Sequence, residues 1–254
     1  LALLREWAPE ARATLEAERR VAAAEGDGLA ELSAVRRLRA LAPEERGLRL
    51  READLELEVG DVGRGLELLE ELAAASPDDP ELTERLGRAR FRWRLELLPP
   101  SSRELTRRPE LTRGDFAVLL YWLFPSVRYG RVVGGGTIAN DVFDHPAREQ
   151  IVKVVNLGLM QVDRTLHRFR PESPLSQGEA LRSLLSLLLL QQPRLACAEG
   201  ATAGELERST TALCRVSAAC GLLPGEGDCL PGATVSGPEA VEAARRTLEQ
   251  LGAD

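Results

Sequence analysis

The chain has few of the residues on which catalysis and membrane insertion usually depend. Its 254 residues include two histidines, one methionine and a single lysine, Lys153, so nearly every basic residue is arginine. Neither histidine has a serine or cysteine nearby that would form a nucleophile–base pair, which argues against histidine-based catalysis. The longest predominantly apolar stretch, Leu184 to Leu190, has only seven residues and predicts a buried helix, not a membrane span.

The chain also lacks an excess of positive charge. It carries 40 acidic and 33 basic residues, for a formal net charge of −7. No basic surplus is available to neutralise phosphates, which argues against a nucleic-acid partner. Apolar residues make up 44% of the chain and charged residues 29%, as in an ordinary globular protein. The length is sufficient for two domains, each with its own core.

Cysteine is absent upstream of Cys197, and the three others are Cys214, Cys220 and Cys229. An even, closely spaced set predicts two disulfides formed in an oxidising compartment. We favour Cys197 with Cys214 and Cys220 with Cys229, because each pair would join a helix to an adjacent loop. Two alternatives stay open: four free thiols, or a zinc site, although there is no Cys-x-x-Cys and both histidines lie far upstream.

A short motif recurs three times in the C-terminal part of the chain. The copies are residues 111–116, 175–180 and 235–240. In each copy a Thr or Ser precedes an acid by three residues, which is the spacing of the capping box that opens a helix. The caps are Thr112, Ser176 and Ser236, and the acids are Asp115, Glu179 and Glu239. Capping explains these acids without paired catalytic carboxylates, so we expect helices to begin beside the three caps.

Residues 141–190 contain the most complete copy. They predict a helix from Pro146 to Gly158, a loop around Phe169 and a second helix that begins at Ser176. A second alignment supports a repeat, because residues 219–223 of the third copy match residues 156–160 of this one. The C-terminal part is therefore expected to hold three related helix-loop-helix units, at about 103–130, 141–192 and 203–252.

This order of elements resembles the S-layer homology (SLH) unit, a helix-loop-helix module of bacterial cell-surface proteins. The resemblance implies that residues 103–254 form a pseudo-threefold bundle of three units. In that family the second helix opens with Thr-Arg-Ala-Glu, and its Arg lies in a groove that takes anionic cell-wall polysaccharide. Thr112-Arg113-Gly114-Asp115 keeps the Thr, the Arg and the acid, whereas Gln177 replaces the Arg in the second copy and Gly237 in the third.

The resemblance implies an envelope-polymer groove formed by a small set of residues around the first two caps. The set is Thr112, Arg113, Asp115, Ser176, Gln177 and Glu179. An arginine at a helix N-terminus suits this chemistry, because it offers a planar fork of donors to a carboxylate. The competing interpretation is that Arg113 is a solvated residue of the first helical turn.

The remaining candidates in this region are two histidines and three apolar residues. We expect His145, beside a predicted helix start, and His167, in a predicted loop, to be structural hydrogen-bonding residues. Phe143, Leu159 and Phe169 are expected in the core. The Gly134–Gly136 run predicts a flexible connector, because a phosphate-binding loop would need a preceding strand, a following helix and a Lys-Ser/Thr pair.

The N-terminal part carries a second repeat, with a period of 34 residues. Pro9, Pro43 and Pro77 are 34 residues apart, and so are the Gly-Asp pairs at 26–27 and 60–61. We expect each Pro to open a helix, and each Gly-Asp pair to close one helix and cap the next. The expected helices are Pro9–Glu25, Gly28–Leu41, Glu44–Val59, Val62–Ala75 and about Pro80–Leu98. The period resembles that of the tetratricopeptide (TPR) family, although most of that family's large aromatic positions are missing.

We therefore predict an all-α protein with two parts: TPR-like helical repeats over residues 1–98 and an SLH-like region over residues 103–254. We expect no catalysis, cofactor, metal or membrane span. The resemblances imply a bacterial cell-envelope or extracellular protein that attaches to envelope polysaccharide or peptidoglycan and binds a protein partner through its TPR-like groove. One alternative is a subunit that self-assembles into a homo-oligomeric surface layer or filament. The other, an enzyme acting on cell-wall glycan through two of the acids, is weaker because capping explains those acids.

Overall fold

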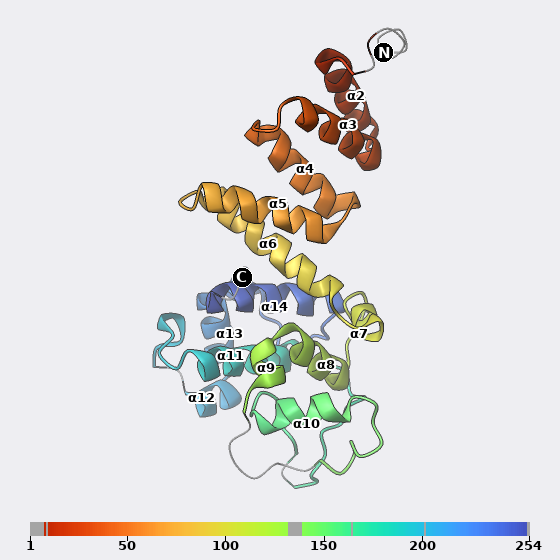
Figure 1. The fold of residues 1–254 in the computed structure, drawn as a ribbon. Helices are drawn as coiled ribbons and strands as arrows, with labels where there is room; N and C mark the ends of the chain where they lie inside the picture. The colour runs from red at the N-terminus through yellow and green to blue at the C-terminus, as the bar shows by residue number, and fades with distance from the viewer. Residues whose placement is uncertain (1–7, 9, 132–138, 164, 201, 253–254) are drawn as a thin grey trace. The chain divides into compact units, whose positions relative to one another are not determined.

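The computed structural model describes residues 8, 10–131, 139–163, 165–200 and 202–252. Over these residues the secondary structure is helical, with three isolated β-bridges and no strand, so the all-α prediction is confirmed (Figure 1). The chain divides into two compact units, Leu1–Arg94 and Leu95–Ala253, here called unit 1 and unit 2. The boundary lies inside α6, a few residues before residue 98, where the first part was expected to end.

Unit 1 consists of consecutive helices, each packed on the next. They are α2 (Arg12–Glu25), α3 (Gly28–Leu41), α4 (Arg46–Val59), α5 (Val62–Ala75) and α6 (Pro80–Glu96), the last of which crosses the boundary. Asp27 caps α3 by accepting from the Ala30 amide, and Asp61 caps α5 by accepting from the Arg64 amide, both at 3.0 Å. Gly26 ends α2 with a φ of +71°, a conformation that favours glycine. The two Gly-Asp pairs thus behave as predicted.

The expectation that the repeated prolines open helices is wrong where the structure describes them. Pro43 and Pro77 lie in the turns before α4 and α6. Each turn is closed by one backbone hydrogen bond. The Glu45 amide donates to Ala42 O at 3.1 Å, and the Asp79 amide donates to Ser76 O at 3.2 Å. Proline at the second position of such a turn has its φ preset, so it shapes the reversal between antiparallel helices. Pro9 lies outside the described residues.

The 34-residue period is also present in the contacts of unit 1. Arg12 forms an ion pair with Glu45 at 2.8 Å, and the residues 34 positions later, Arg46 and Asp79, form an ion pair as well. The core of the unit combines apolar residues of successive helices. One cluster joins α4, α5 and α6 through Ala53, Leu68, Leu69, Leu72, Leu82 and Ala89. Repeated spacing in the sequence therefore places equivalent residues in equivalent contacts.

Unit 2 contains longer helices separated by short ones. They are α7 (Pro100–Leu105), α8 (Arg113–Leu123), α9 (Pro125–Tyr129), α10 (Arg148–Asn156), α11 (Gln177–Gln191), α12 (Ala203–Arg208), α13 (Thr210–Ala219) and α14 (Gly237–Leu251), with the 3-10 turns η1 (Ala196–Ala198) and η2 (Glu226–Asp228). Helix α8 packs on α10 and α14, and α11 packs on α13 and α14. Helix α10 begins at Arg148 rather than Pro146, which lies in the preceding turn.

The three predicted capping boxes are present, and they open α8, α11 and α14. The predicted alignment of helix ends is also confirmed. Gly158 after α10 and Gly221 after α13 have φ of +73° and +69°. In each case the following leucine amide bonds back at 2.9 Å to a carbonyl five residues earlier, which closes the helix end in the same way.

A ring of three backbone hydrogen bonds joins the residues that precede the three caps. The Leu111 amide donates to Val235 O at 2.8 Å, the Leu175 amide to Leu111 O at 2.8 Å, and the Val235 amide to Leu175 O at 3.1 Å. All three side chains are buried. Three segments about 60 residues apart in sequence therefore meet at one place in the interior of unit 2.

The apolar stretch from Leu184 to Leu190 lies in α11, and most of its leucines are buried, as predicted. None of the helices in the described residues combines the length and the apolar character needed to cross a membrane. The Gly134–Gly136 run, expected to be a flexible connector, lies outside the described residues.

Candidate functional site

The site begins with the loop between α10 and α11, which is fixed by residues far away in the sequence. Asp141 accepts hydrogen bonds from the Phe169 amide at 2.8 Å and the Arg170 amide at 2.7 Å. Arg113, at the start of α8, donates from Nε to Phe169 O at 2.8 Å and from Nη2 to Gln161 O at 2.7 Å. Its guanidinium also stacks over the Phe169 ring, 4.7 Å from the centroid. Arg113 thus fastens this loop to α8.

The same guanidinium forms an ion pair through Nη1 with Glu179, the acid of the second capping box. The Arg113 side chain is only 12% exposed. The interpretation of Arg113 as a solvated first-turn residue is therefore wrong. Its donors already have partners in this chain, and its charge is balanced by Glu179, so it differs from an arginine that holds its fork open to solvent.

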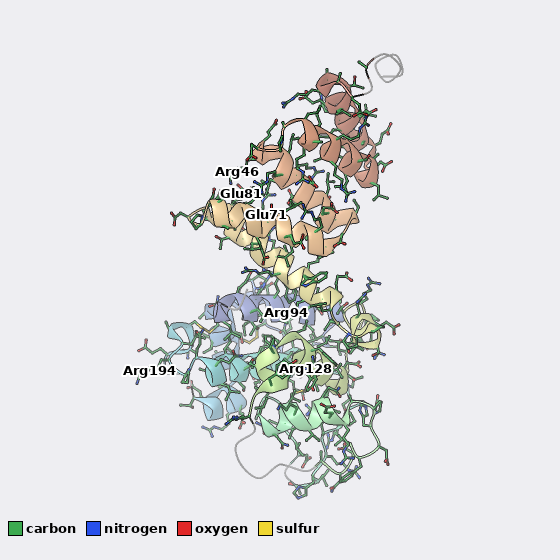
Figure 2. The ribbon with its side chains drawn as sticks, in the orientation of Figure 1. Arg46, Glu71, Glu81, Arg94, Arg128 and Arg194 are labelled. Atoms are coloured by element: carbon green, nitrogen blue, oxygen red, sulfur yellow. A yellow bond between two sulfur atoms is a disulfide. The ribbon has the colours of Figure 1, made fainter. Side chains whose placement is uncertain are left out.

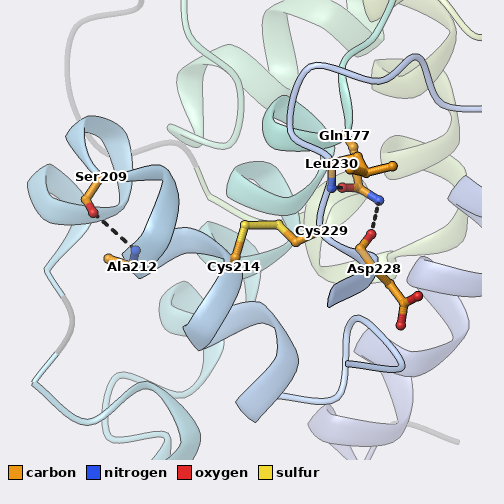
Figure 3. The surroundings of a disulfide bond; sticks show 7 residues. All are labelled: Gln177, Ser209, Ala212, Cys214, Asp228, Cys229 and Leu230. Carbon is orange, nitrogen blue, oxygen red and sulfur yellow. Dashed lines mark hydrogen bonds between the residues drawn. A yellow bond between two sulfur atoms is a disulfide. The ribbon is translucent and has the colours of Figure 1, made fainter. Parts of the chain in front are cut away.

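Gln177 occupies the position of Arg113 in the second copy, and it fastens the loop between α13 and α14 by hydrogen bonds. Its Nε2 donates to Asp228 O at 3.2 Å, and its Oε1 accepts from the Leu230 amide at 2.5 Å (Figure 3). Both residues occupy the first position of a helix and fasten the loop of the next copy. The replacement of Arg by Gln therefore preserves a clamp between neighbouring copies.

The ion pair between Arg113 and Glu179 joins the first two capping boxes, but the predicted groove residues line different cavities. Arg113 and Glu179 line a cavity of about 420 Å³. Gln177 lines a different cavity of about 620 Å³, and Thr112 and Asp115 line a third of about 460 Å³. Ser176 uses its hydroxyl within its capping box.

The cavity beside Arg113 contains a cation that sequence reasoning missed. Arg182, on α11, is half-buried in its wall, and it forms no ion pair or hydrogen bond with any residue that the structure describes. Ser186 lies on the same helix one turn further and also lines the cavity, and Leu159 and Met160 add apolar surface. The signal for Arg182 was present in the sequence: it is the one basic residue of a leucine-rich helix and lies three residues after Glu179.

Two other polar residues of this cavity, Gln161 and Ser183, have partners within the chain. Gln161 donates to Glu207 at 3.0 Å, and the Ser183 hydroxyl donates to Glu179 O at 2.8 Å. Among the charged residues of the lining, Arg182 is therefore the one without an ion pair or hydrogen bond in the described chain. A guanidinium in a concave, partly apolar wall can accept a carboxylate or phosphate with two parallel hydrogen bonds. The arrangement suits binding of an anion.

Two disulfides are present, but the predicted pairing is wrong. Cys197 is bonded to Cys220 and Cys214 to Cys229, and among the described residues no cysteine is free. Cys220, the C-cap of α13, is bonded to Cys197 in η1. Cys214, within α13, is bonded to Cys229 in the loop that Gln177 clamps (Figure 3). Two disulfides are typical of proteins that fold in an oxidising compartment.

The two histidines and Phe143 complete the set of candidates. His145 Nε2 lies 3.1 Å from Glu172 Oε1, and its Nδ1 accepts from the Ala147 amide at 3.1 Å, so it serves the predicted structural role. The His167 side chain is exposed, and its backbone carbonyl accepts from the Asn140 amide at 2.7 Å. The expectation that Phe143 is a core residue is wrong: it is 50% exposed.

The described residues contain no group of three or more His, Cys, Asp or Glu side chains placed to hold a metal ion. This unit combines clamped loops, two disulfides and a cavity in whose wall Arg182 forms no ion pair with a described residue. No protein-family model matches the chain, and no curated protein gives a significant match to it.

Proposed function

We propose that this chain is a non-enzymatic protein of the bacterial cell envelope. Unit 2 attaches it to an anionic envelope polymer, and unit 1 binds a protein partner. The observation that carries the proposal is Arg182, a half-buried guanidinium in the wall of a cavity of about 420 Å³ with no partner among the described residues. A partly desolvated charge without a counterion gains more from an anionic ligand than a fully solvated one does.

The arrangement of unit 2 supports the SLH-like part of the proposal. Three capped helices meet through the ring formed by Leu111, Leu175 and Val235. Arg113 and Gln177 fasten successive copies in the same manner. These features suit a pseudo-threefold bundle of SLH-like units, whose expected ligand is an acidic polysaccharide of the envelope. The two disulfides favour a location outside the cytoplasm, at the bacterial surface or in the periplasm.

The cavity offers both kinds of contact that an acidic sugar requires. Arg182 supplies the charge, Ser186 a hydroxyl, and Leu159 and Met160 an apolar surface for the face of a sugar ring. The ion pair between Arg113 and Glu179 forms one side of the cavity and holds it in shape. The proposed groove is thus the cavity that Arg113 itself lines, with Arg182 rather than Arg113 as the residue that contacts the ligand.

Unit 1 supports the protein-binding part. Its helices repeat with a period of 34 residues, in the sequence and in the pairs Arg12–Glu45 and Arg46–Asp79. Stacked helical repeats of this length present extended surfaces that bind other proteins, and the TPR-like period makes such a partner the natural one.

The polymer claim is tested with Arg182→Gln and its matched control Arg194→Gln. Arg194 is exposed and lines none of the three cavities named above. We expect the wild type and Arg194→Gln to sediment with isolated cell-wall material and to bind soluble polygalacturonate. Arg182→Gln should bind about tenfold more weakly, as for the loss of one charge-assisted hydrogen-bonded contact. Equal binding by all three proteins, or no binding by the wild type, would remove the proposal.

Arg113→Ala is a poorer probe of ligand contact. It would release the Phe169 carbonyl and leave Glu179 without its ion-pair partner, so the loop and the cavity would change together. We expect this variant to lose thermal stability as well as binding. Arg182→Gln should keep the wild-type melting temperature, because Arg182 makes no contact of this kind within the described chain.

A further inference from the structure

A different cavity in unit 2, of about 410 Å³, is lined by three cationic side chains. They are Arg128 on α9 and Arg148 and Lys153 on α10. In the part of the chain that the structure describes, none of the three forms an ion pair with a carboxylate. Most arginines of this acidic protein do have such a partner close by, so this grouping is unusual within the molecule.

Interactions other than ion pairs hold the three cations in position. The Arg128 guanidinium lies over the Trp122 ring at 4.2 Å and near the rings of Tyr129 and Tyr121 at 5.3 and 5.8 Å. Figure 2 labels Arg128 among the helices of unit 2. The Lys153 ammonium donates to Gly130 O at 2.7 Å, and Arg148 lies over the Phe143 ring at 5.4 Å. Aromatic faces and a carbonyl orient these charges but do not neutralise them.

The one carboxylate in the lining of this cavity, Glu149, is bonded to another lining residue, Tyr121. Glu149 Oε1 accepts a hydrogen bond from the Tyr121 hydroxyl at 2.8 Å. This bond raises the pKa of Tyr121. The lining therefore has three positive charges and one negative charge that is already engaged.

We infer that this cavity binds an oxyanion, namely a carboxylate or phosphate group carried by a larger ligand. Arg128 is stacked on Trp122, which presets the plane of its fork for two parallel hydrogen bonds. Lys153 adds a point charge with donors to spare, and Arg148 adds a third charge at the exposed edge. Charges of one sign gathered in a concavity raise the local concentration of the opposite ion, which strengthens the attraction beyond that of a flat surface.

This site is separate from the one beside Arg182, yet the two adjoin. Asn156 lines the present cavity, and the next residue, Leu157, lines the other. A ligand with acidic groups at intervals would reach both around the C-terminal end of α10. The evidence for the oxyanion site is the cavity and its three cations, and it is independent of the proposed envelope function.

The chain offers a direct readout, because Lys153 is its single lysine. Acylation of Lys153 by an amine-reactive reagent is followed by mass spectrometry in the presence of glucuronate, glucose 6-phosphate or neutral glucose. We expect at least one of the two anions to slow acylation, by about tenfold at ten times its Kd, and glucose to have no effect. Protection by glucuronate alone identifies a carboxylate ligand, protection by the sugar phosphate alone a phosphate ligand, and protection by both a general oxyanion site.

Three variants complete the experiment. Arg148→Gln removes an exposed charge from the cavity. It should raise the Kd of the anion that slows acylation about tenfold. Arg194→Gln removes an exposed charge from a residue outside it and should change nothing. Arg182→Gln should also leave protection unchanged, which separates this site from the proposed polymer cavity. The inference is overturned if neither anion slows acylation, or if Arg148→Gln and Arg194→Gln behave alike.

Discussion

Arg36 and Glu56 form an ion pair between α3 and α4, and the residues 34 positions later, Glu70 and Arg90, form an ion pair with the charges exchanged. The two pairs have different surroundings. The Glu56 carboxylate is 1% exposed, accepts from Arg36 Nη2 at 2.5 Å and also accepts the Asp61 amide at 3.0 Å. Glu70 and Arg90 are 3.4 Å apart and largely solvated. The repeat thus keeps the position of the ion pair, but the buried pair and the exposed pair contribute differently to the free energy of unfolding.

Glu56→Gln should lower the free energy of unfolding by about 2 kcal/mol, because it removes a charge-assisted bond from a buried site. The matched control is Glu70→Gln, which changes the solvated pair and should cost less than about 0.5 kcal/mol. Urea denaturation followed by circular dichroism measures both. Equal losses in the two variants would contradict the difference in burial on which this prediction rests.

The loss of unfolding free energy at low pH should depend in part on Glu242 in α14. Hydrogen bonds from Arg245, and then from Arg246, lower the pKa of Glu242 from 4.5 to about 2. A carboxyl group whose pKa is lower in the folded state stabilises the fold fully above its unfolded pKa. That contribution is lost as the pH falls through the folded pKa. Glu242 is 45% exposed, so solvent screening keeps its contribution below about 1 kcal/mol.

The measurement compares the wild type with Glu242→Gln in urea at a series of pH values. The difference in unfolding free energy should be constant well above pH 4.5 and should fall toward zero as the pH drops below about 2. Other carboxyl groups titrate in both proteins, so the difference isolates Glu242. A difference that persists unchanged below pH 2 would show that the ion pairs with Arg245 and Arg246 are not its source.

The disulfide connectivity can be checked by proteolysis without reduction. Cleavage after arginine separates Cys197 from Cys214, and cleavage after Glu226 separates Cys220 from Cys229. We expect linked fragments containing Cys197 with Cys220 and Cys214 with Cys229. Fragments linking Cys197 with Cys214 would restore the pairing favoured from sequence.

Removal of a disulfide gives an energetic counterpart to this mapping. Replacing Cys214 and Cys229 together by alanine should lower the unfolding free energy by about 3 kcal/mol, as for a closed loop of roughly 15 residues. The double alanine variant of Cys197 and Cys220 should lose slightly more, because its loop is longer. Thermal unfolding of the oxidised proteins measures both losses.

Two glycines near the starts of helices should respond to alanine in opposite ways. A Cβ on Gly237 of α14 would lie 2.2 Å from the Leu105 carbonyl oxygen, whereas a Cβ on Gly47 of α4 would meet nothing within 4 Å. Gly237→Ala should therefore lose about 1–3 kcal/mol through forced separation of the two segments. Gly47→Ala should gain up to about 1 kcal/mol from helix propensity. Stabilisation of both variants would show that the backbone around Leu105 can move away from a Cβ at residue 237 at little energetic cost.

Features that depend on neighbours in the sequence could be predicted well. The caps at Thr112, Ser176 and Ser236 involve atoms three residues apart, so the motif alone is sufficient to locate the helix starts. The Gly-Asp pairs were predictable for the same reason. The short helices α7, α9 and α12 were not, because helices of five or six residues are stabilised by packing more than by propensity.

The candidate site was predictable only in part. The motif around Arg113 identified the right region, but its partners Phe169 and Glu179 lie 56 and 66 residues away. Nothing in the spacing indicated that Glu179 would neutralise Arg113 and that Arg182 would be left with an open fork. The disulfide partners were missed for a similar reason: the faces of α13 on which the two loops lie are set by packing.

By itself the sequence determined an all-α protein, the 34-residue repeat of the first unit and the three capped helix starts of the second. These follow from hydrogen bonds and side-chain periodicities that act within one or two turns of a helix. Only the tertiary structure decided that Leu111, Leu175 and Val235 form a ring, which cysteines are joined and which arginines keep an unpaired charge. Those outcomes depend on contacts between segments far apart in sequence. Local helix preferences do not distinguish between the possible contacts, and the burial of apolar surface selects among them.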